Sequence, residues 1–286
     1  MKKLSIPGAI CLAFAALFLF LGIGIFVQQS NAGPMLEKEL IMLDAPVVLP
    51  ENEGKLVAIQ GEVIVGDDRP EDDEFGIISY TPILYRRVSM YQWQEDRQTF
   101  GNNTEYEYSK TWSEKVINSL VFNDPVMHGN PLIKPYETKS FHAQNLTLGD
   151  FQIDAVLFAY VPADRAIPME SLGFEHPGMT TVGNCFQTDH AGAGPSIGDV
   201  RVAFNSIEHD LLLDVTVMGK QSGNAIVPYV SNKLPDDQKL WTKSMTKDDI
   251  IRDAQATGQV WGLFTCGVAL VFGAVGAVLV LRKRRA

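Results

Sequence analysis

The sequence predicts a membrane-anchored, mixed β-rich (α+β) extracytoplasmic domain with one transmembrane helix at each end. Two runs without a charged residue, 8–27 and 258–281, are long enough to cross a bilayer, which takes about 20 apolar residues. Backbone polar groups find no water inside lipid, so both runs are expected to be helical. Between them, apolar and polar residues alternate in short stretches, as they do in strands with two different faces.

Basic residues beside the two apolar runs predict the topology. Lys2 and Lys3 precede the first run, and residues 282–285 after the second run are all Lys or Arg. Such residues tend to stay in the cytoplasm, so both termini are expected inside and the domain outside. The expected parts are a cytoplasmic N-terminus (1–7), a transmembrane helix (8–27), the β-rich domain (31–245), a juxtamembrane helix (246–257), a second transmembrane helix (258–281) and a basic cytoplasmic tail (282–286).

A cleaved signal peptide is the alternative for the first run. Ser30, Asn31 and Ala32 offer small residues at a plausible cleavage position. The apolar core of a signal peptide usually spans about 7–15 residues, and this run is longer, which favours an uncleaved anchor. Cleavage after Ala32 would leave one C-terminal anchor and would not change the side on which the domain lies.

The acidic residues all lie between the two apolar runs. Residues 31–257 contain all 34 Asp and Glu beside 18 of the 24 Lys and Arg, which gives the domain a formal charge of −16. Nucleic acid binds positively charged protein surfaces, so this acidic composition argues against nucleic acid as a partner. The same charge favours solubility and repels anionic lipid headgroups.

Period-two alternation predicts that most of the domain is strand. Clusters of Gly, Pro, Asn and Asp separate the alternating stretches, which favours an antiparallel or mixed β architecture. The expected strands are residues 56–59, 63–65, 84–93, 151–159, 200–204 and 211–217.

Helices are expected on either side of these strands. Pro34 suits the first position of a short helix with Leu36, Leu40 and Leu43 on one face. Near the end, Thr246 and Asp249 have the spacing of an N-terminal capping box. They predict the juxtamembrane helix. Whether this helix continues into the second span is left open.

Residues 67–74 are the most charged stretch, and the domain has a single cysteine, Cys185. The charged stretch is predicted to be a solvated hairpin loop, because it lacks the glycine and the carboxylate spacing of an EF-hand calcium loop. Cys185 has no second thiol in the domain to pair with. It is predicted to be a buried apolar thiol, with an intermolecular bridge as the alternative.

Catalytic and metal sites find little support. A zinc site needs three or four converging ligands, and Cys185 and His190 are the only such pair close in sequence, with His176 and His209 farther away. Residues 194–198 fit G-x-S-x-G, but they are expected to lead from a loop into a strand, whereas a nucleophile elbow joins a strand to a helix. The prediction is therefore no catalytic residue, no metal, no cofactor and no enzymatic activity.

The second apolar run contains small residues four positions apart: Ala269, Gly273 and Ala277. Small residues at this spacing let membrane helices approach closely. They are candidate helix-packing residues, for self-association or for a partner helix. The alternative is an ordinary membrane helix rich in Gly and Ala.

Residues 84–95 read LYRRVSMYQWQE, and this stretch resembles the signature of the transmembrane protein 43 family, also called LUMA. In that family Leu and Arg lead into Val-Glu-Met-Tyr-Gln-Trp and a following Glu; here Ser89 replaces the acidic residue. Residues 53–57, the aromatic series Tyr106, Tyr108 and Trp112, and residues 197–202 resemble the same family in the same order.

The resemblance implies an N-terminal membrane helix, a large luminal or periplasmic domain, C-terminal membrane helices and a role as a membrane organiser or scaffold. It implies no catalytic residues. The chain departs from the family in having one C-terminal span, where the animal proteins carry more, and in lacking Asn-Glu-Gly after the first span.

The sequence thus predicts a non-enzymatic scaffold of membrane protein complexes, bound to the lipid bilayer and to membrane protein partners or further copies of itself. A bacterial inner membrane with a periplasmic domain is the expected location, or the endoplasmic reticulum or nuclear envelope in a eukaryote. The alternatives are a metal-assisted envelope enzyme and a periplasmic sensor subunit. The candidate interaction face comprises Arg86, Met90, Tyr91, Trp93, Glu95 and Trp112, because Tyr, Trp and Arg are enriched at interfaces.

Overall fold

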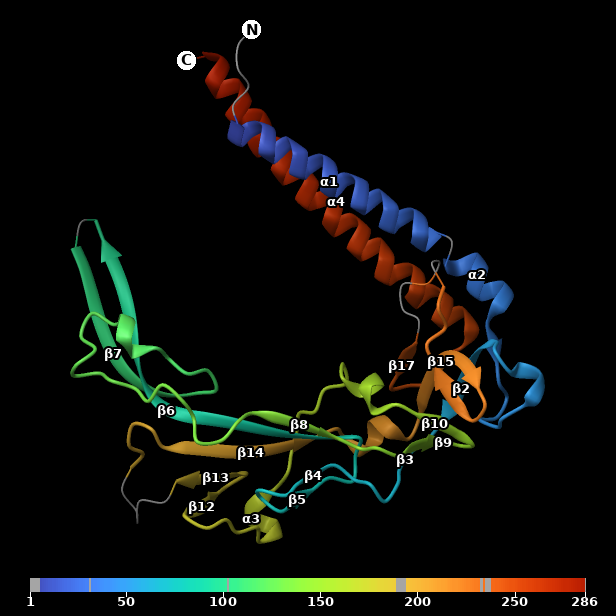
Figure 1. The fold of residues 1–286 in the computed structure, drawn as a ribbon, viewed down its shortest axis with the longest axis horizontal. Coiled ribbons are helices and arrows are strands. Elements are labelled where there is room, and N and C mark those ends of the chain that lie inside the picture. Colours follow the sequence, from blue (N-terminus) through green and yellow to red (C-terminus); the bar gives the residue numbers. More distant parts are fainter. Residues whose placement is uncertain are drawn as a thin grey trace. The chain divides into compact units, whose positions relative to one another are not determined.

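The fold is known from a computed structural model that describes residues 6–30, 32–101, 103–188, 194–231, 234 and 238–285. The chain forms two compact units. The first comprises residues 1–63, 148–153 and 213–286, and the second comprises residues 64–147 and 154–212. Both units are rich in strands, and an apolar helix lies at each end of the chain (Figure 1). These features confirm the mixed β-rich class.

The first unit contains all the long helices described here and a small mixed sheet. Its helices are α1 (Ile6–Ser30), α2 (Ala32–Glu39), η1 (Pro50–Asn52) and α4 (Lys247–Arg285), and its strands are β1 (Ile41–Met42), β2 (Leu56–Gly61), β10 (Phe151–Ile153), β15 (Val215–Ser222), β16 (Ala225–Val227) and β17 (Lys239–Trp241). The strands follow the order β1-β2-β15-β16-β10, and β17 also pairs with β15. Two short strands, β3 (Val63–Val65) and β9 (Leu146–Leu148), lie where the chain passes from one unit to the other.

The second unit is built on an antiparallel sheet in the order β12-β13-β14-β6-β7, with β11 also pairing with β14 and β8 with β6. Its remaining strands, β4 and β5, form a separate hairpin. The elements are β4 (Glu71–Asp72), β5 (Ile77–Ile78), β6 (Ile83–Phe100), β7 (Asn103–Ser113), η2 (Ser119–Val121), β8 (Lys139–His142), η3 (Ala155–Phe158), β11 (Arg165–Ala166), α3 (Met169–Leu172), β12 (Met179–Val182), β13 (Cys185–Thr188), β14 (Val200–Ser206) and η4 (His209–Leu212).

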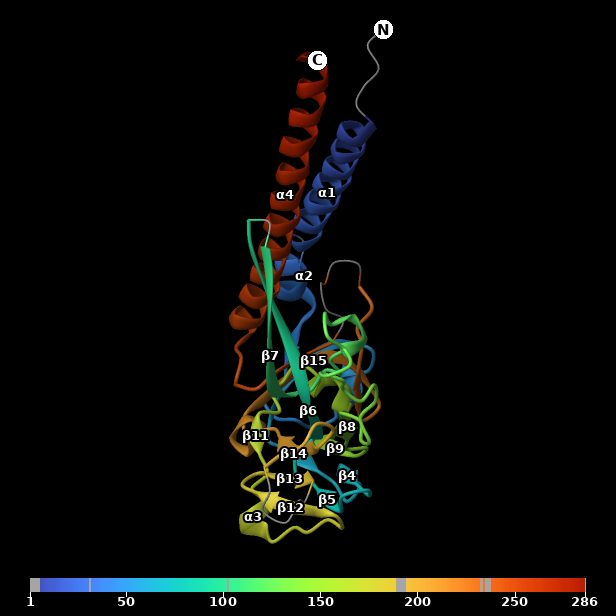
Figure 2. The same ribbon diagram turned by 90° about the vertical axis from the view of Figure 1, so that its left-hand side faces the viewer.

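The two apolar helices have the length and composition of membrane spans. The most apolar 18-residue window has a mean hydropathy of 2.5 in Ile6–Ile25 and of 2.4 in Lys247–Leu281. Both views show α1 in blue and α4 in red lying side by side (Figures 1 and 2). The expected juxtamembrane helix and the expected second span belong to one continuous helix, α4.

Helix α4 begins with the capping box. The Asp249 N–H donates to the Thr246 hydroxyl at 3.2 Å, and the Thr246 N–H donates to the Asp249 carboxylate at 3.1 Å. Each side chain thus satisfies a backbone donor that the first turn leaves unpaired. Aspartate serves here in place of the preferred glutamate.

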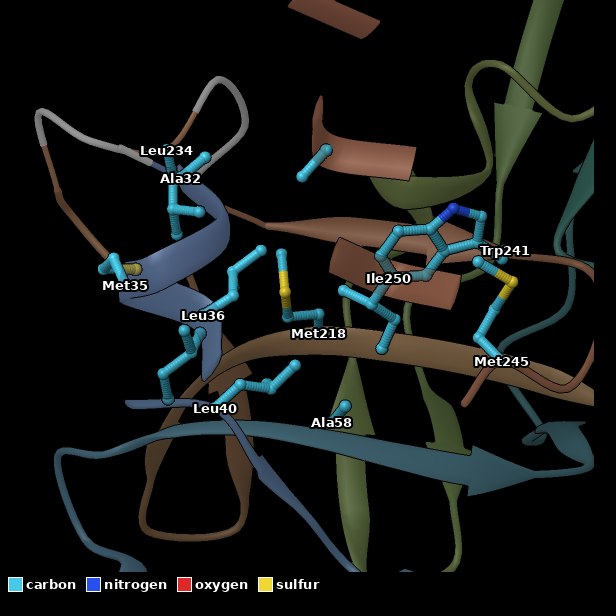
Figure 3. Close-up of a cluster of buried hydrophobic side chains, with 12 residues drawn as sticks. Ala32, Met35, Leu36, Leu40, Ala58, Met218, Leu234, Trp241, Met245 and Ile250 are labelled. Carbon is cyan, nitrogen blue, oxygen red and sulfur yellow. The ribbon is translucent and has the colours of Figure 1, made fainter. Parts of the chain in front are cut away.

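The first turns of α4 lie in the core of the first unit. Figure 3 shows Ile250 of α4 beside Met218 of β15 and Leu36 of α2. The Asp253 carboxylate accepts hydrogen bonds from Lys239 Nζ at 2.6 Å and from the Trp241 indole at 3.2 Å. Buried apolar contacts and partly buried hydrogen bonds therefore join the first turns of α4 to the sheet of the first unit.

Three expectations for local structure need correction. The strand expected over residues 151–159 ends at Ile153, because the Asp154 side chain accepts from the Val156 N–H at 2.9 Å and begins the turn η3. Likewise, β15 begins only at Val215, after the turn η4. The helix expected from Pro34 begins at Ala32 and ends before Leu40.

The charged stretch of residues 67–74 also differs from its prediction. It contributes to the β4–β5 hairpin, but it is not wholly solvated, since Asp72 is only 1% exposed. A buried carboxylate needs a charged partner. That partner is Arg86 of β6, which lies 2.9 Å away.

Candidate functional site on the sheet of the second unit

Strand β6 has one buried and one outward face, and the candidate residues divide between them. Arg86, Met90 and Gln92 point into the unit and are buried, whereas Tyr91 and Trp93 on the other face are only half-buried. Alternate residues of a strand point to opposite sides of its sheet. Arg86 and Met90 therefore cannot share a surface with Tyr91, and including them in the interaction face was wrong.

Arg86 instead holds the interior together. Its guanidinium lies 2.9 Å from Asp72 and 2.6 Å from Glu74, and its Nε donates to the Glu137 carbonyl at 2.9 Å. Burial raises the pKa of Asp72, and the positive charge of Arg86 partly offsets that rise. The first arginine of the signature is thus a structural cation inside the second unit.

The outward face brings together aromatic rings and cations from three strands. Tyr91 of β6 lies opposite Trp112 of β7, with ring centroids 5.2 Å apart. The Arg201 guanidinium of β14 lies 4.1 Å from the Trp112 ring, and Lys110 Nζ lies 4.7 Å from the Trp93 ring. Such contacts are cation–π interactions, worth about 0.5–1 kcal/mol at exposed sites. We call Tyr91, Trp93, Lys110, Trp112 and Arg201 the aromatic face.

Arg201 and Lys110 were not among the sequence candidates. Arg201 lies more than a hundred residues after the signature and meets Trp112 only because β14 pairs with β6. A local signal did exist for Lys110, since it alternates with Tyr108 and Trp112 along β7. Arginine is enriched at protein interfaces, and both arginine and lysine form cation–π contacts with aromatic rings.

Part of β6 is covered by the loop that follows β7. The Asn130 side chain accepts from the Trp93 N–H at 2.7 Å and donates to the Trp93 carbonyl at 2.8 Å. It thus takes the place of a neighbouring strand at this edge, where unpaired backbone groups would otherwise invite association. The His128 ring stacks on Tyr108 at 3.7 Å and meets the Trp93 ring edge-on at 4.7 Å.

Glu95 closes the same network. Its carboxylate accepts from the Tyr108 hydroxyl and from the Asn123 N–H, each at 2.6 Å. Desolvation, together with the hydrogen bond to Glu95, raises the pKa of Tyr108. Glu95 therefore fastens the loop to the sheet and is not a free contact residue.

Three of the residues considered for metal binding, His176, Cys185 and His209, lie in separate segments of the second unit. Cys185 of β13 is half-buried, its thiol donates to the Val182 carbonyl at 3.2 Å, and burial raises its pKa. His176 stacks on Phe75 at 4.5 Å, His209 lies in η4, and His190 falls outside the described residues. Across the residues that the structure describes, no group of three or more His, Cys, Asp or Glu could hold a metal ion.

The G-x-S-x-G stretch stands in the context expected for a loop. It leads through Asp199 into β14, and the Ser196 N–H donates to the Asp199 carboxylate at 2.6 Å. A nucleophile elbow would place its serine between a strand and a helix. This serine precedes a strand instead.

The candidate helix-packing residues meet a helix of the same chain. Ala269 is buried, and a Cβ added at Gly273 would lie 3.8 Å from Ala15 of α1. Ala277 is exposed, and Gly276 takes its place: an added Cβ there would lie 3.1 Å from the Gly8 carbonyl oxygen. Ala277 therefore does not pack on α1, because four-residue steps drift around a helix that has 3.6 residues per turn; its packing on another helix stays a prediction.

Helices α1 and α4 pack antiparallel through small residues. Gly8 near the start of α1 meets Gly276 near the end of α4, whereas Gly22 near the end of α1 meets Thr265 and Cys266. On α1 the small residues Gly8, Ala15 and Gly22 recur every seven positions, as in two helices that pack along a common seam. Two of the candidate helix-packing residues, Ala269 and Gly273, therefore lie on or near a helix pair formed within the chain.

Comparison with known proteins supplies the family. The family described as Transmembrane protein 43 matches residues 90–283. Transmembrane protein 43 of Mus musculus is 27% identical over 79% of this chain and 60% of its own length. The protein of the same name from Homo sapiens is 26% identical over the same shares, and a homolog from Drosophila melanogaster is 26% identical over 80% of this chain and 64% of its own length.

The chain therefore spans roughly three fifths of the length of these relatives. No solved structure matches it. The family match covers most of the described sheet of the second unit, the first unit from β10 onward and almost all of α4. The chain belongs to the transmembrane protein 43 family.

Proposed function

We propose that this integral membrane protein is a scaffold without enzymatic activity, which gathers other membrane proteins through a domain outside the cytoplasm. The observation that carries the proposal is the aromatic face, where Trp112 contacts both Tyr91 and Arg201 on one side of the sheet. Tyr, Trp and Arg dominate the binding energy of protein interfaces. A surface with these three types in contact suits a protein partner.

The packing of two helices in the core of the first unit supports the same role. α4 begins inside the core of the first unit, and α2, which follows α1, packs in that core as well. The first unit, fixed in this way to its membrane helices, holds a constant orientation toward the bilayer. That property suits a protein around which others assemble.

The side of the membrane follows from charge. Residues 282–285 are basic and follow the apolar part of α4, and Lys2 and Lys3 precede α1. Positive residues beside a span favour the cytoplasm. The domain then faces the periplasm in a bacterium, or the lumen of the endoplasmic reticulum or nuclear envelope in a eukaryote.

The assembly state in mild detergent tests the scaffold. We expect the full chain to be recovered in complexes larger than the monomer, and the double variant W112A/R201Q to lose most of them. Removing an interface anchor costs about 2 kcal/mol or more, a weakening of roughly 30-fold. R165Q is the matched control, because Arg165 forms an exposed ion pair with Glu208 in the same unit.

Two results would count against the proposal. An extract that contains only monomer would contradict the scaffold itself. Complexes that the double variant retains in full, with its circular dichroism unchanged, would contradict the assignment of the aromatic face as the partner surface.

A further inference from the structure

The loop between β7 and β8 exposes an unusual number of aliphatic side chains. Within it, residues 120–133 contain six large apolar side chains that are between 56% and 88% exposed. Single exposed apolar residues are ordinary, but a concentration of them marks a site of interaction. These residues, which we call the aliphatic loop set, are Leu120, Val121, Val126, Met127, Leu132 and Ile133.

The loop is held in place by polar contacts. Asn130 bonds both backbone groups of Trp93, and its own N–H donates to the Ser119 hydroxyl at 2.8 Å. His128 stacks on Tyr108. Because these contacts fix the backbone, the aliphatic side chains stay exposed and do not collapse onto the sheet.

The charge of the loop differs from that of the domain around it. Residues 116–133 contain one carboxylate, Asp124, and no Lys or Arg, whereas residues 31–257 carry a net charge of −16. An acidic surface is repelled by anionic lipid headgroups. This loop is a part of the domain that can approach a bilayer without that repulsion.

The types of side chain distinguish a lipid from a protein partner. Anchors at protein interfaces are mainly Trp, Tyr and Arg, while Leu and Val are under-represented. The aliphatic loop set contains only Leu, Val, Met and Ile. Side chains without a polar end suit hydrocarbon, and the two apolar helices of the chain keep the domain tethered to a bilayer.

We propose that the aliphatic loop set inserts into the boundary between headgroups and acyl chains of the bilayer that α1 and α4 span. Apolar groups bound in this way reach about 5–10 Å into that boundary. The loop would then be a second membrane contact, separate from the helices. This inference rests on membrane integration and does not depend on the scaffold role.

Fluorescence quenching in lipid nanodiscs that hold one copy of the full chain tests the proposal. An environment-sensitive fluorescent amino acid replaces Val126, which is 88% exposed, or Tyr160, which is 98% exposed in the same unit and serves as the control. We expect nitroxide-labelled phospholipid to quench position 126 at least about twofold more than position 160. Aqueous iodide should show the reverse order.

Other outcomes overturn the proposal. Equal iodide quenching at both positions, without lipid quenching, would mean that the loop stays in water. Protection of position 126 from iodide without lipid quenching would mean that another part of the same chain covers it. As a further check, the variant L132D/I133D should lose lipid quenching at position 126 while its circular dichroism stays unchanged; retained quenching would exclude the aliphatic loop set as the anchor. Single-copy discs contain no partner protein, so a failure here leaves the scaffold proposal intact.

Discussion

Two neighbouring arginines of β6 show how burial decides the role of a residue. Arg86 is 5% exposed and balances the buried Asp72, whereas the side chain of Arg87 is about half exposed and pairs with Glu114 on the outward face. An exposed ion pair gains little over water, but a buried carboxylate without its cation is costly. Adjacent identical residues therefore contribute very differently to stability.

The contrast between these arginines can be measured. R86M leaves Asp72 buried without a cation, and we expect it to destabilise the protein by about 3–5 kcal/mol. R87M, its matched control, should cost about 0–1 kcal/mol. Denaturant or thermal unfolding of the full chain in detergent, followed by near-ultraviolet circular dichroism, compares the two, and equal midpoints for both variants would contradict the structural role of Arg86.

At the scale of elements, the close contact of α1 and α4 depends on small residues. A Cβ added at Gly22 would lie 2.7 Å from Thr265 Oγ1 and 2.8 Å from Cys266 Sγ, whereas nothing lies within 4 Å of one added at Gly24. Lipid tails are as apolar as leucine, so helices in a membrane associate by close packing and not by the hydrophobic effect. Glycine at position 22 permits that packing.

This contact predicts a cross-link. Because Cys266 Sγ lies within bonding reach of a side chain at position 22, G22C should form a disulfide with Cys266 on mild oxidation, within one chain. G24C, two residues away, should not. Mobility in non-reducing gels distinguishes the products. C266S should abolish the internal bond, and a dimer that C266S also abolishes would indicate that α4 packs on another copy.

At the scale of the whole molecule, α4 and the helix that follows α1 enter one core. Lys247 at the start of α4 donates to the Glu37 carbonyl of α2 at 2.7 Å, and buried residues of both helices pack on β2 and β15. The two ends of the first unit are thus joined outside the apolar segments. An antiparallel pair of spans puts both termini on the same side of the bilayer.

Protease protection tests that topology. In sealed vesicles with the cytoplasmic face inward, added protease should digest the domain and spare an epitope fused after α4. Vesicles opened by detergent should lose both. A protected domain with a digested epitope would reverse the proposed orientation, which rests on the basic flanks of the two spans.

Local patterns in the sequence predicted much of the fold. The two apolar helices, β2, β3, most of β6, β14 and the capping box at Thr246 all occur where a local period or spacing indicated them. The prediction failed where a local contact competed with the period, as at Asp154, whose side chain begins a turn and ends β10. The alternation after that residue gives no sign of the change.

The sequence by itself determined the class of the protein, a membrane-anchored β-rich chain. The length of the apolar runs, the charges beside them and the period-two alternation are short-range properties, so each can be recognised without knowing the tertiary structure. The tertiary structure alone decided which residues can act together. It placed Arg86 inside against Asp72, brought Arg201 onto Trp112, and joined Gly22 to Cys266 across the helix pair. Each of these contacts joins parts of the chain that meet only through strand pairing or packing, so no local period encodes them.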